Sequence, residues 1–425
     1  MVNFHISLSQ LFHYSITRYK NKILEISEKS PYIKNGLGIG ATPKAATGLS
    51  ERVLRVNEGR GCSDSGIAES PTAACLPEPP NKKEKLMEKL ILDTKWDKTF
   101  KLDDSVSHKK VTFTNHFGIT LAADMYTPTI RQAQGPKDDR KLPAIAVCGP
   151  FGAVKEQCSG LYAHEMAKRG FLTIAFDPSF CGESGGQPRY MNSPDINTED
   201  FQAAVDFLSV QPNVDSEKIG IIGICGWGGW ALNTAGIDTR IKATAVMTMY
   251  DMARCTNNGY FDAADCDDAR YQARVAVNKL RTECFAKGEY APVGGLPQER
   301  PGDPEFFGQY WDYYKTPRGY HPRSLNSNGG WASTAATSLM NTKLFSYANE
   351  IRSAVLVVHG EKAHSRYFGE TAFKQMTDGS KWTENKELMI IPNATHCDLY
   401  DGGNGNFIPW EKLQNFFESN LKEEE

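Results

Sequence analysis

The 425-residue sequence has no excess of charge of either sign, because 48 Lys and Arg residues are balanced by 51 Asp and Glu residues. The net charge of −3 leaves no surplus of positive side chains to neutralise a phosphate backbone or an anionic lipid surface. We therefore expect neither nucleic acid nor a membrane as a partner.

Long hydrophobic runs are also absent. The most apolar stretch, residues 219–232, has 14 residues and is broken by five glycines, whereas a spanning helix needs ~20 apolar residues. Near the N-terminus the apolar residues are interrupted by Ser, Gln and His, so no continuous signal-peptide core is present. The sequence predicts no transmembrane segment and no signal peptide, and hence a cytoplasmic location.

The ten cysteines form no C-x-x-C pair and no short repeating framework. This scatter is typical of reduced thiols in a large core, and it argues against a disulfide scaffold and a metal cluster. We expect no metal site.

The chain divides by pattern into two parts. Residues 1–85 show neither helical nor strand periodicity, which predicts a poorly ordered extension. Residues 86–425 begin with two strands joined by a turn and continue with apolar strands that alternate with helices. The strands are expected at 111–114, 119–126, 144–148, 171–176, 218–224, 241–249, 354–359 and 387–391, and the helices at 160–169, 198–210, from 226, 368–376 and 410–421. This alternation predicts an α/β fold with a mostly parallel central sheet flanked by helices.

One connection is far longer than the others. Residues 252–353 exceed the usual loop and single helix between two strands, so we expect an inserted helical lid. Aromatic residues at 310, 311, 313 and 314 either wall a substrate pocket or pack a small helical subdomain, and the sequence leaves both open.

The sharpest local signal is Cys225, which ends a buried strand and precedes a glycine-rich helix start. A nucleophile elbow places its side chain in such a turn, and the helix N-terminus is expected to lower the thiol pKa. Two alternatives remain: Gly226-x-Gly228-x-x-Ala231 followed by Asp251 also fits a dinucleotide fingerprint, and the cysteine could be structural.

A second feature has the matching order along the chain. His396 lies in the loop after the last strand, where a general base for Cys225 is expected. In the loop after the first parallel strand, Pro150 has no N–H group, so Phe151 is the better donor to join Gly226 in an oxyanion hole.

These segments resemble an α/β-hydrolase of the dienelactone hydrolase-like branch, which includes polyketide transferase-like proteins. The resemblance covers about residues 90–423 and rests on the elbow and on segments 177–189, 360–365 and 396–401. It implies the α/β-hydrolase fold, a Cys or Ser nucleophile and acyl chemistry without a cofactor or metal. Two positions depart from the family pattern: Trp227 replaces the usual glycine, and Ala363 stands at the usual acid position.

The acid behind the histidine is the least clear member of a catalytic triad. Asp251 ends the strand beside the nucleophile's strand and is the preferred candidate. Glu361 and Asp398 are alternatives, as is a site with no acid.

The sequence thus predicts a carboxylic ester hydrolase that cleaves a small ester, lactone or thioester through an acyl-Cys225 intermediate, with His396 and Asp251 completing the triad. Acyl transfer from the same nucleophile is one alternative. A hydrolase-fold binding protein without catalysis is the other.

Overall fold

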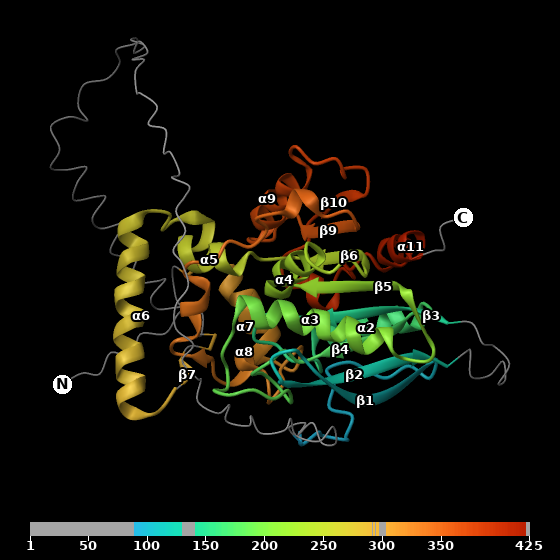
Figure 1. Ribbon diagram of the computed structural model, residues 1–425, viewed down its shortest axis with the longest axis horizontal. Helices are drawn as coiled ribbons and strands as arrows, with labels where there is room; N and C mark the ends of the chain where they lie inside the picture. The colour runs from blue at the N-terminus through green and yellow to red at the C-terminus, as the bar shows by residue number, and fades with distance from the viewer. Residues whose placement is uncertain (1–88, 130–140, 291, 294, 297–302, 422–425) are drawn as a thin grey trace, which may run out of the picture. The chain divides into compact units, whose positions relative to one another are not determined.

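The computed structural model describes residues 89–129, 141–290, 292–293, 295–296 and 303–421, and an eight-stranded sheet forms its centre (Figure 1). The expected extension over residues 1–85 lies outside the described residues.

The sheet has the order β1-β2-β4-β3-β5-β6-β9-β10. The pairs β1–β2 and β2–β4 are antiparallel, and all other neighbouring strands pair in parallel. The strands are β1 (Val106–Thr114), β2 (Thr120–Pro128), β3 (Leu142–Cys148), β4 (Leu172–Phe176), β5 (Val214–Ile224), β6 (Ile241–Met247), β9 (Ala354–Gly360) and β10 (Lys386–Ile391). The predicted mostly parallel sheet, opened by two antiparallel strands, is confirmed.

Helices cover both faces of the sheet. On one face α2 (Cys158–Lys168) and α11 (Trp410–Asn420) share a core with the strands. On the other face lie α3 (Pro194–Ser209), α4 (Gly226–Ala235) and α9 (Arg366–Thr377). Burial on both faces explains why β5 and β9 are continuous apolar runs without the alternation of a half-exposed strand.

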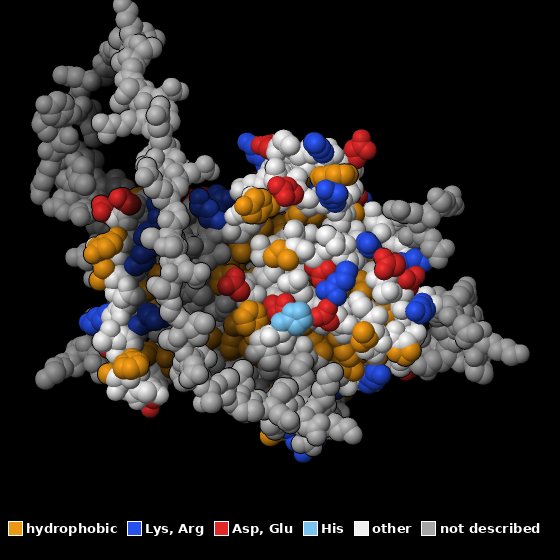
Figure 2. Space-filling view, viewed as in Figure 1, with side chains coloured by type: hydrophobic (Ala, Val, Ile, Leu, Met, Phe, Trp, Pro, Cys, Tyr) orange, Lys and Arg blue, Asp and Glu red, His pale blue; other side chains and the backbone are white. Residues whose placement is uncertain are grey.

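The long connection between β6 and β9 forms mainly short elements, and one long helix, α6, runs along one side of the molecule (Figure 1). Its elements are α5 (Met252–Asn258), η1 (Tyr260–Asp262), α6 (Asp267–Lys287), β7 (Pro292–Val293), α7 (Phe306–Lys315), α8 (Leu325–Asn328), β8 (Trp331–Ala332), η2 (Ala335–Leu339) and η3 (Ala348–Glu350). Figure 2 shows hydrophobic side chains along the outer surface of α6, where Tyr271, Val275 and Phe285 are exposed. Among the described helices, none combines the length and apolarity needed to span a membrane.

Candidate active site

Cys225 is the single residue between the end of β5 and the start of α4. Its backbone has φ 56° and ψ −125°, in a region that residues other than glycine rarely occupy. The amide of Cys225 donates to the Met247 carbonyl at 2.9 Å, and its carbonyl accepts from the Tyr250 amide at 2.9 Å. This strained strand-to-helix turn is the geometry of a nucleophile elbow.

The neighbours of Cys225 explain how the turn closes. A Cβ atom on Gly223 would lie 2.3 Å from the Trp227 carbonyl oxygen, so only glycine fits there. Trp227 occupies the position where the resemblance implies glycine, yet its indole is buried in the core against Phe201 and Trp230, with ring centroids 5.7 and 5.2 Å away. The Trp227 side chain, which replaces the usual glycine, therefore fills the core behind the elbow.

Four hydrogen-bond donors act on the Cys225 thiol: the hydroxyl of Tyr400, the backbone amides of Phe151 and Gly226, and the hydroxyl of Tyr310. Burial raises the pKa of the Cys225 thiol above its ordinary value, although these four donors oppose the rise. The expected lowering of the pKa at the helix N-terminus is therefore not found, because burial outweighs it.

His396 follows β10 and is completely buried. Its Nε2 atom lies 3.0 Å from the hydroxyl oxygen of Tyr400, which belongs to α10 (Asp398–Asp401). Tyr400 therefore contacts both the sulfur of Cys225 and the imidazole of His396. The structure brings the predicted nucleophile and base to one place and adds a tyrosine hydroxyl that links them.

The Nδ1 atom of His396 faces two hydroxyl groups. Ser365 Oγ lies 2.6 Å away and Thr248 Oγ1 lies 2.8 Å away. Thr248 directly follows β6 and Ser365 follows β9. They therefore come from the two loops in which the sequence predicted the triad carboxylate.

The three candidate carboxylates are engaged elsewhere. Asp251 caps α5 and accepts from the Arg254 amide at 2.9 Å, which differs from the expected pairing with His396. Glu361 accepts from the Asn393 amide at 2.8 Å. Asp398 accepts from the amide and hydroxyl of Thr395, each at 2.8 Å.

Aromatic side chains of the long connection pack against His396 and Tyr400. The Tyr310 hydroxyl lies 3.0 Å from that of Tyr250, and its ring centroid is 5.4 Å from that of His396. Tyr313 and Tyr314 of the same helix pack against Tyr400. Trp311 differs, because it is only partly buried and lies under the Lys315 ammonium.

The backbone donor at Phe151 is held firmly. Its ring stacks between Trp331 and Trp230, with centroids 3.9 and 5.6 Å away. The Phe151 carbonyl accepts from Asn326 Nδ2 at 2.8 Å, and the next carbonyl, of Gly152, accepts from Ser324 Oγ at 2.9 Å. The contacts from the α8 and β8 region and from Trp230 hold the Phe151 side chain and the two carbonyl groups that follow its amide.

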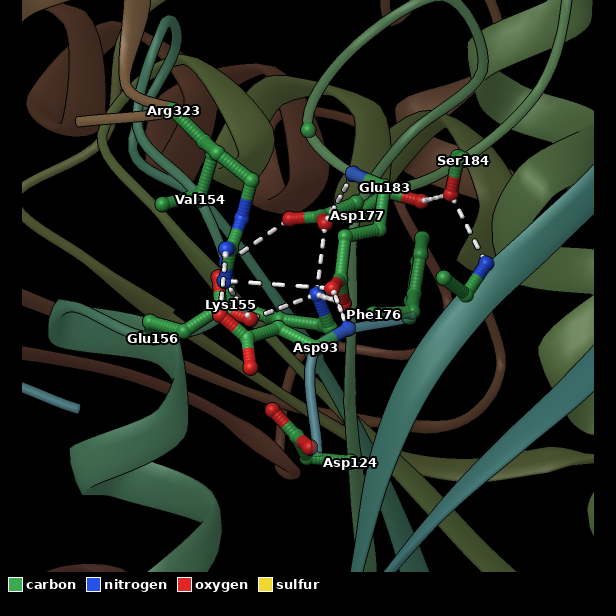
Figure 3. A network of polar contacts seen from close by, with 12 residues as sticks. Asp93, Asp124, Val154, Lys155, Glu156, Phe176, Asp177, Glu183, Ser184 and Arg323 are labelled. Atoms are coloured by element: carbon green, nitrogen blue, oxygen red, sulfur yellow. Dashed lines mark hydrogen bonds and ion pairs between the residues drawn. The ribbon is translucent and has the colours of Figure 1, made fainter. Parts of the chain in front are cut away.

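A buried ionic network anchors the other end of the same loop (Figure 3). The Lys155 ammonium lies 2.6 Å from Glu156, 2.8 Å from Asp177 and 2.6 Å from Glu183, and its side chain is completely buried. Burial alone would lower the Lys155 pKa, but these carboxylates raise it well above its ordinary value. The three carboxylates lie close enough together to bind a cation, and the ammonium already bonds to each of them.

The sequence predicts Cys225, His396, Phe151 and Gly226 as site residues, and the structure adds Thr248, Ser365 and Tyr400, which the sequence did not predict, as partners of His396. The only available signal was position: Ser365 and Tyr400 lie inside the segments that carry the family resemblance.

Comparison with known proteins supports the fold. An uncharacterised protein of Pseudomonas aeruginosa, PA2218, is 49% identical over 333 residues, which are 78% of this chain and 86% of that protein. Its crystal structure covers 78% of this chain and 99% of its own with a TM-score of 0.73. The crystal structure of the α/β hydrolase GrgF from Penicillium shares the fold, with a TM-score of 0.58, 18% identity, and coverage of 74% of this chain and 99% of its own.

A relative whose name states an activity matches over a shorter region. Thiohydrolase aneE of Aspergillus aculeatus is 32% identical over 140 residues, which are 33% of this chain and 41% of that protein. Residues 118–397 match the family described as X-Pro dipeptidyl-peptidase (S15 family), and this range contains the elbow and every strand of the central sheet except β1. The chain therefore belongs to the S15 family and has the α/β-hydrolase fold.

Proposed function

We propose that the chain hydrolyses small esters, lactones or thioesters through an acyl-Cys225 intermediate. The observation that carries the proposal is the convergence on one sulfur atom of the Phe151 and Gly226 amides and of a hydroxyl that contacts His396. Two amides directed at a nucleophile are the arrangement that stabilises an oxyanion formed by its attack.

In the acylation step the sulfur attacks the substrate carbonyl as the thiol loses its proton. Tyr400 accepts this proton and passes its own to Nε2 of His396, so the hydroxyl ends unchanged. The negative charge on the carbonyl oxygen is stabilised by the amides of Phe151 and Gly226. When the tetrahedral intermediate collapses, the bond to the leaving group breaks and the imidazolium returns the proton to that group.

Deacylation reverses the roles. A water molecule attacks the acyl-cysteine carbonyl while His396 takes the water proton, and the Cys225 sulfur leaves and recovers a proton. A thioester is the preferred substrate class within this proposal, because the name of the relative aneE states thiohydrolase activity for that protein.

The chemistry of the site favours the cleavage of esters and thioesters over peptide cleavage. Among the described residues, the hydrogen-bond and ring partners of Cys225 and His396 include no carboxylate that could hold the free amino group of a dipeptide. We expect turnover of 4-nitrophenyl acetate and of a butyryl thioester, and no release of 4-nitroaniline from Gly-Pro-4-nitroanilide.

The test replaces the nucleophile. Cys225→Ala should abolish turnover of the ester and the thioester and remove the acyl adduct seen by intact-protein mass spectrometry. Cys266→Ala, at the N-terminus of α6, is the matched control and should retain wild-type kcat/KM. Full activity in Cys225→Ala would exclude the acyl-cysteine mechanism.

Transfer of the acyl group to an acceptor other than water is the second candidate. Cys225 is only 6% exposed and lies among aromatic rings, which limits the access of water to the acyl-enzyme. Adding an alcohol or amine acceptor to the thioester assay separates the two reactions, since transfer yields a new ester or amide instead of the free acid.

A further inference from the structure

The hydroxyl groups behind His396 are unlike the usual partner of a catalytic histidine. Ser365 Oγ and Thr248 Oγ1 lie 2.6 and 2.8 Å from Nδ1, and all three side chains are essentially buried. A base at Nε2 requires the proton of the neutral ring to sit on Nδ1, where a hydroxyl oxygen can accept it.

Sheet pairing places both hydroxyls there. Met247 at the end of β6 pairs with Val358 of β9, and the next residue, Thr248, donates its amide to the Val358 carbonyl at 2.7 Å. Ser365 comes from the neighbouring strand: it lies in the loop that follows β9 and directly precedes α9. Two loops at one edge of the sheet therefore meet at one imidazole nitrogen.

We propose that Ser365, assisted by Thr248, is the positioning residue that replaces the triad carboxylate behind His396, an inference that rests on the proposed function. A hydroxyl can accept the Nδ1 proton and orient the ring as a carboxylate does. It carries no charge, however, and does not stabilise the imidazolium as a carboxylate would.

The surroundings of the ring add no opposite charge. The titratable groups that face His396 are Tyr250, Tyr310, His364 and Tyr400, with Cys225 beyond Tyr400, and none of these described groups is a carboxylate. Burial, followed by the neighbouring imidazoles at 364 and 359, holds the pKa of His396 well below its ordinary range.

This arrangement has a consequence for the pH profile. The imidazole stays neutral, and able to accept a proton, at pH values where an ordinary histidine of pKa ~6.5 is protonated. The acid limb of kcat/KM should therefore lie below ~6.5, and introducing a carboxylate behind Nδ1 should move it upward.

The experiment measures kcat and KM for 4-nitrophenyl acetate from pH 4 to 9 in the full chain. Ser365→Ala should lower kcat by about 10- to 100-fold, part of the ~10²–10⁴-fold effect of a positioned general base, with KM nearly unchanged. Ser365→Asp should raise the acid limb by about one pH unit or more relative to Ser365→Asn, because an adjacent negative charge raises an imidazole pKa by that amount.

Thr248→Val, which keeps the side-chain shape, should lower kcat further when combined with Ser365→Ala. Ser346→Ala, in which an exposed hydroxyl that bonds the Lys343 carbonyl is removed, is the matched control and should behave as wild type. If Ser365→Asp does not fold, as judged by its thermal midpoint, Ala363→Asp and Ala363→Asn in the same loop provide the same comparison.

An unchanged kcat in Ser365→Ala, or coincident pH profiles for the Asp and Asn variants, would overturn the inference. Failure of the proposed function has a different signature. In that case Cys225→Ala would keep its turnover, whereas an inactive Cys225→Ala together with an unaffected Ser365→Ala would contradict only the role of Ser365.

Discussion

The Tyr400 hydroxyl oxygen lies 3.0 Å from Nε2 of His396 and also hydrogen-bonds to the Cys225 sulfur. In a direct triad the imidazole nitrogen contacts the nucleophile itself. Here the hydroxyl of Tyr400, whose side chain is completely buried, interacts with both groups. Burial raises the pKa of Tyr400 well above its ordinary value, so the hydroxyl keeps its proton and can relay one without ionising.

Replacing this hydroxyl tests the relay. We expect Tyr400→Phe to lower kcat by at least about 10-fold, within the range attributed to proton transfer, with a smaller effect on KM. Tyr347→Phe is the control, because Tyr347 is 70% exposed. Steady-state kinetics with 4-nitrophenyl acetate would contradict the relay if the two variants had equal kcat values.

The state of the thiol can be read from its alkylation. Because the pKa of Cys225 is raised, the thiolate fraction should increase only as the pH climbs above ~8.5, the ordinary value of a free cysteine. Iodoacetamide labelling of Cys225, followed by peptide mass spectrometry from pH 6 to 10, should give a midpoint above that of glutathione. A midpoint below pH 7 would indicate a thiolate–imidazolium pair and disagree with a neutral resting site.

The carboxylates favoured by the sequence provide a further test. Asp251→Asn should remain active, because its side chain caps α5 and asparagine is also an effective cap. Glu361→Gln should remain active as well, since Glu361 bonds the exposed Asn393 amide. A loss of kcat of ~100-fold or more in either variant would return that residue to the triad.

The buried Lys155 network predicts a large effect on stability. Lys155→Met leaves Glu156, Asp177 and Glu183 without their central cation, and removing one partner from a buried pair typically destabilises a protein by about 3–5 kcal/mol. Lys412→Met, which removes a pair whose side chains are 35% and 46% exposed, should change the free energy of unfolding by less than about 1 kcal/mol. Urea unfolding of both variants makes the comparison, and equal midpoints would show that the network does not stabilise the fold.

Acid should weaken the ion pairs that Glu156 makes in the same network. Burial raises the pKa of Glu156, but Lys155 and Arg323 outweigh burial and hold it well below its ordinary value. A group with a lowered pKa in the folded state stabilises the protein above its unfolded pKa and loses this contribution as the pH falls. The unfolding midpoint of the wild type should therefore decrease below about pH 4.5, and that of Lys155→Met should decrease less.

The sequence predicted the sheet well because each buried parallel strand is a continuous apolar run, as in residues 219–224. It also predicted the strand-to-helix turn at Cys225, because an apolar strand there runs directly into a glycine-rich helix start. It could not identify Thr248 and Ser365, because serine and threonine are common and hydroxyl groups carry no recognisable spacing. Their meeting depends on the pairing of β6 with β9 across the long connection. The pKa of Cys225 was predicted in the wrong direction, because a helix start is visible in sequence while burial is not.

The contacts that hold Phe151 determine whether the inserted segment could be exchanged independently of the sheet. Three of the four side chains that hold Phe151 and Gly152, at positions 324, 326 and 331, belong to the connection between β6 and β9, and the fourth, Trp230, belongs to α4. Phe151, one of the two proposed oxyanion donors, is therefore held mainly by the inserted segment. Exchanging this segment for that of a relative would alter reactivity along with substrate preference, so the insertion and the catalytic core form a single module for engineering.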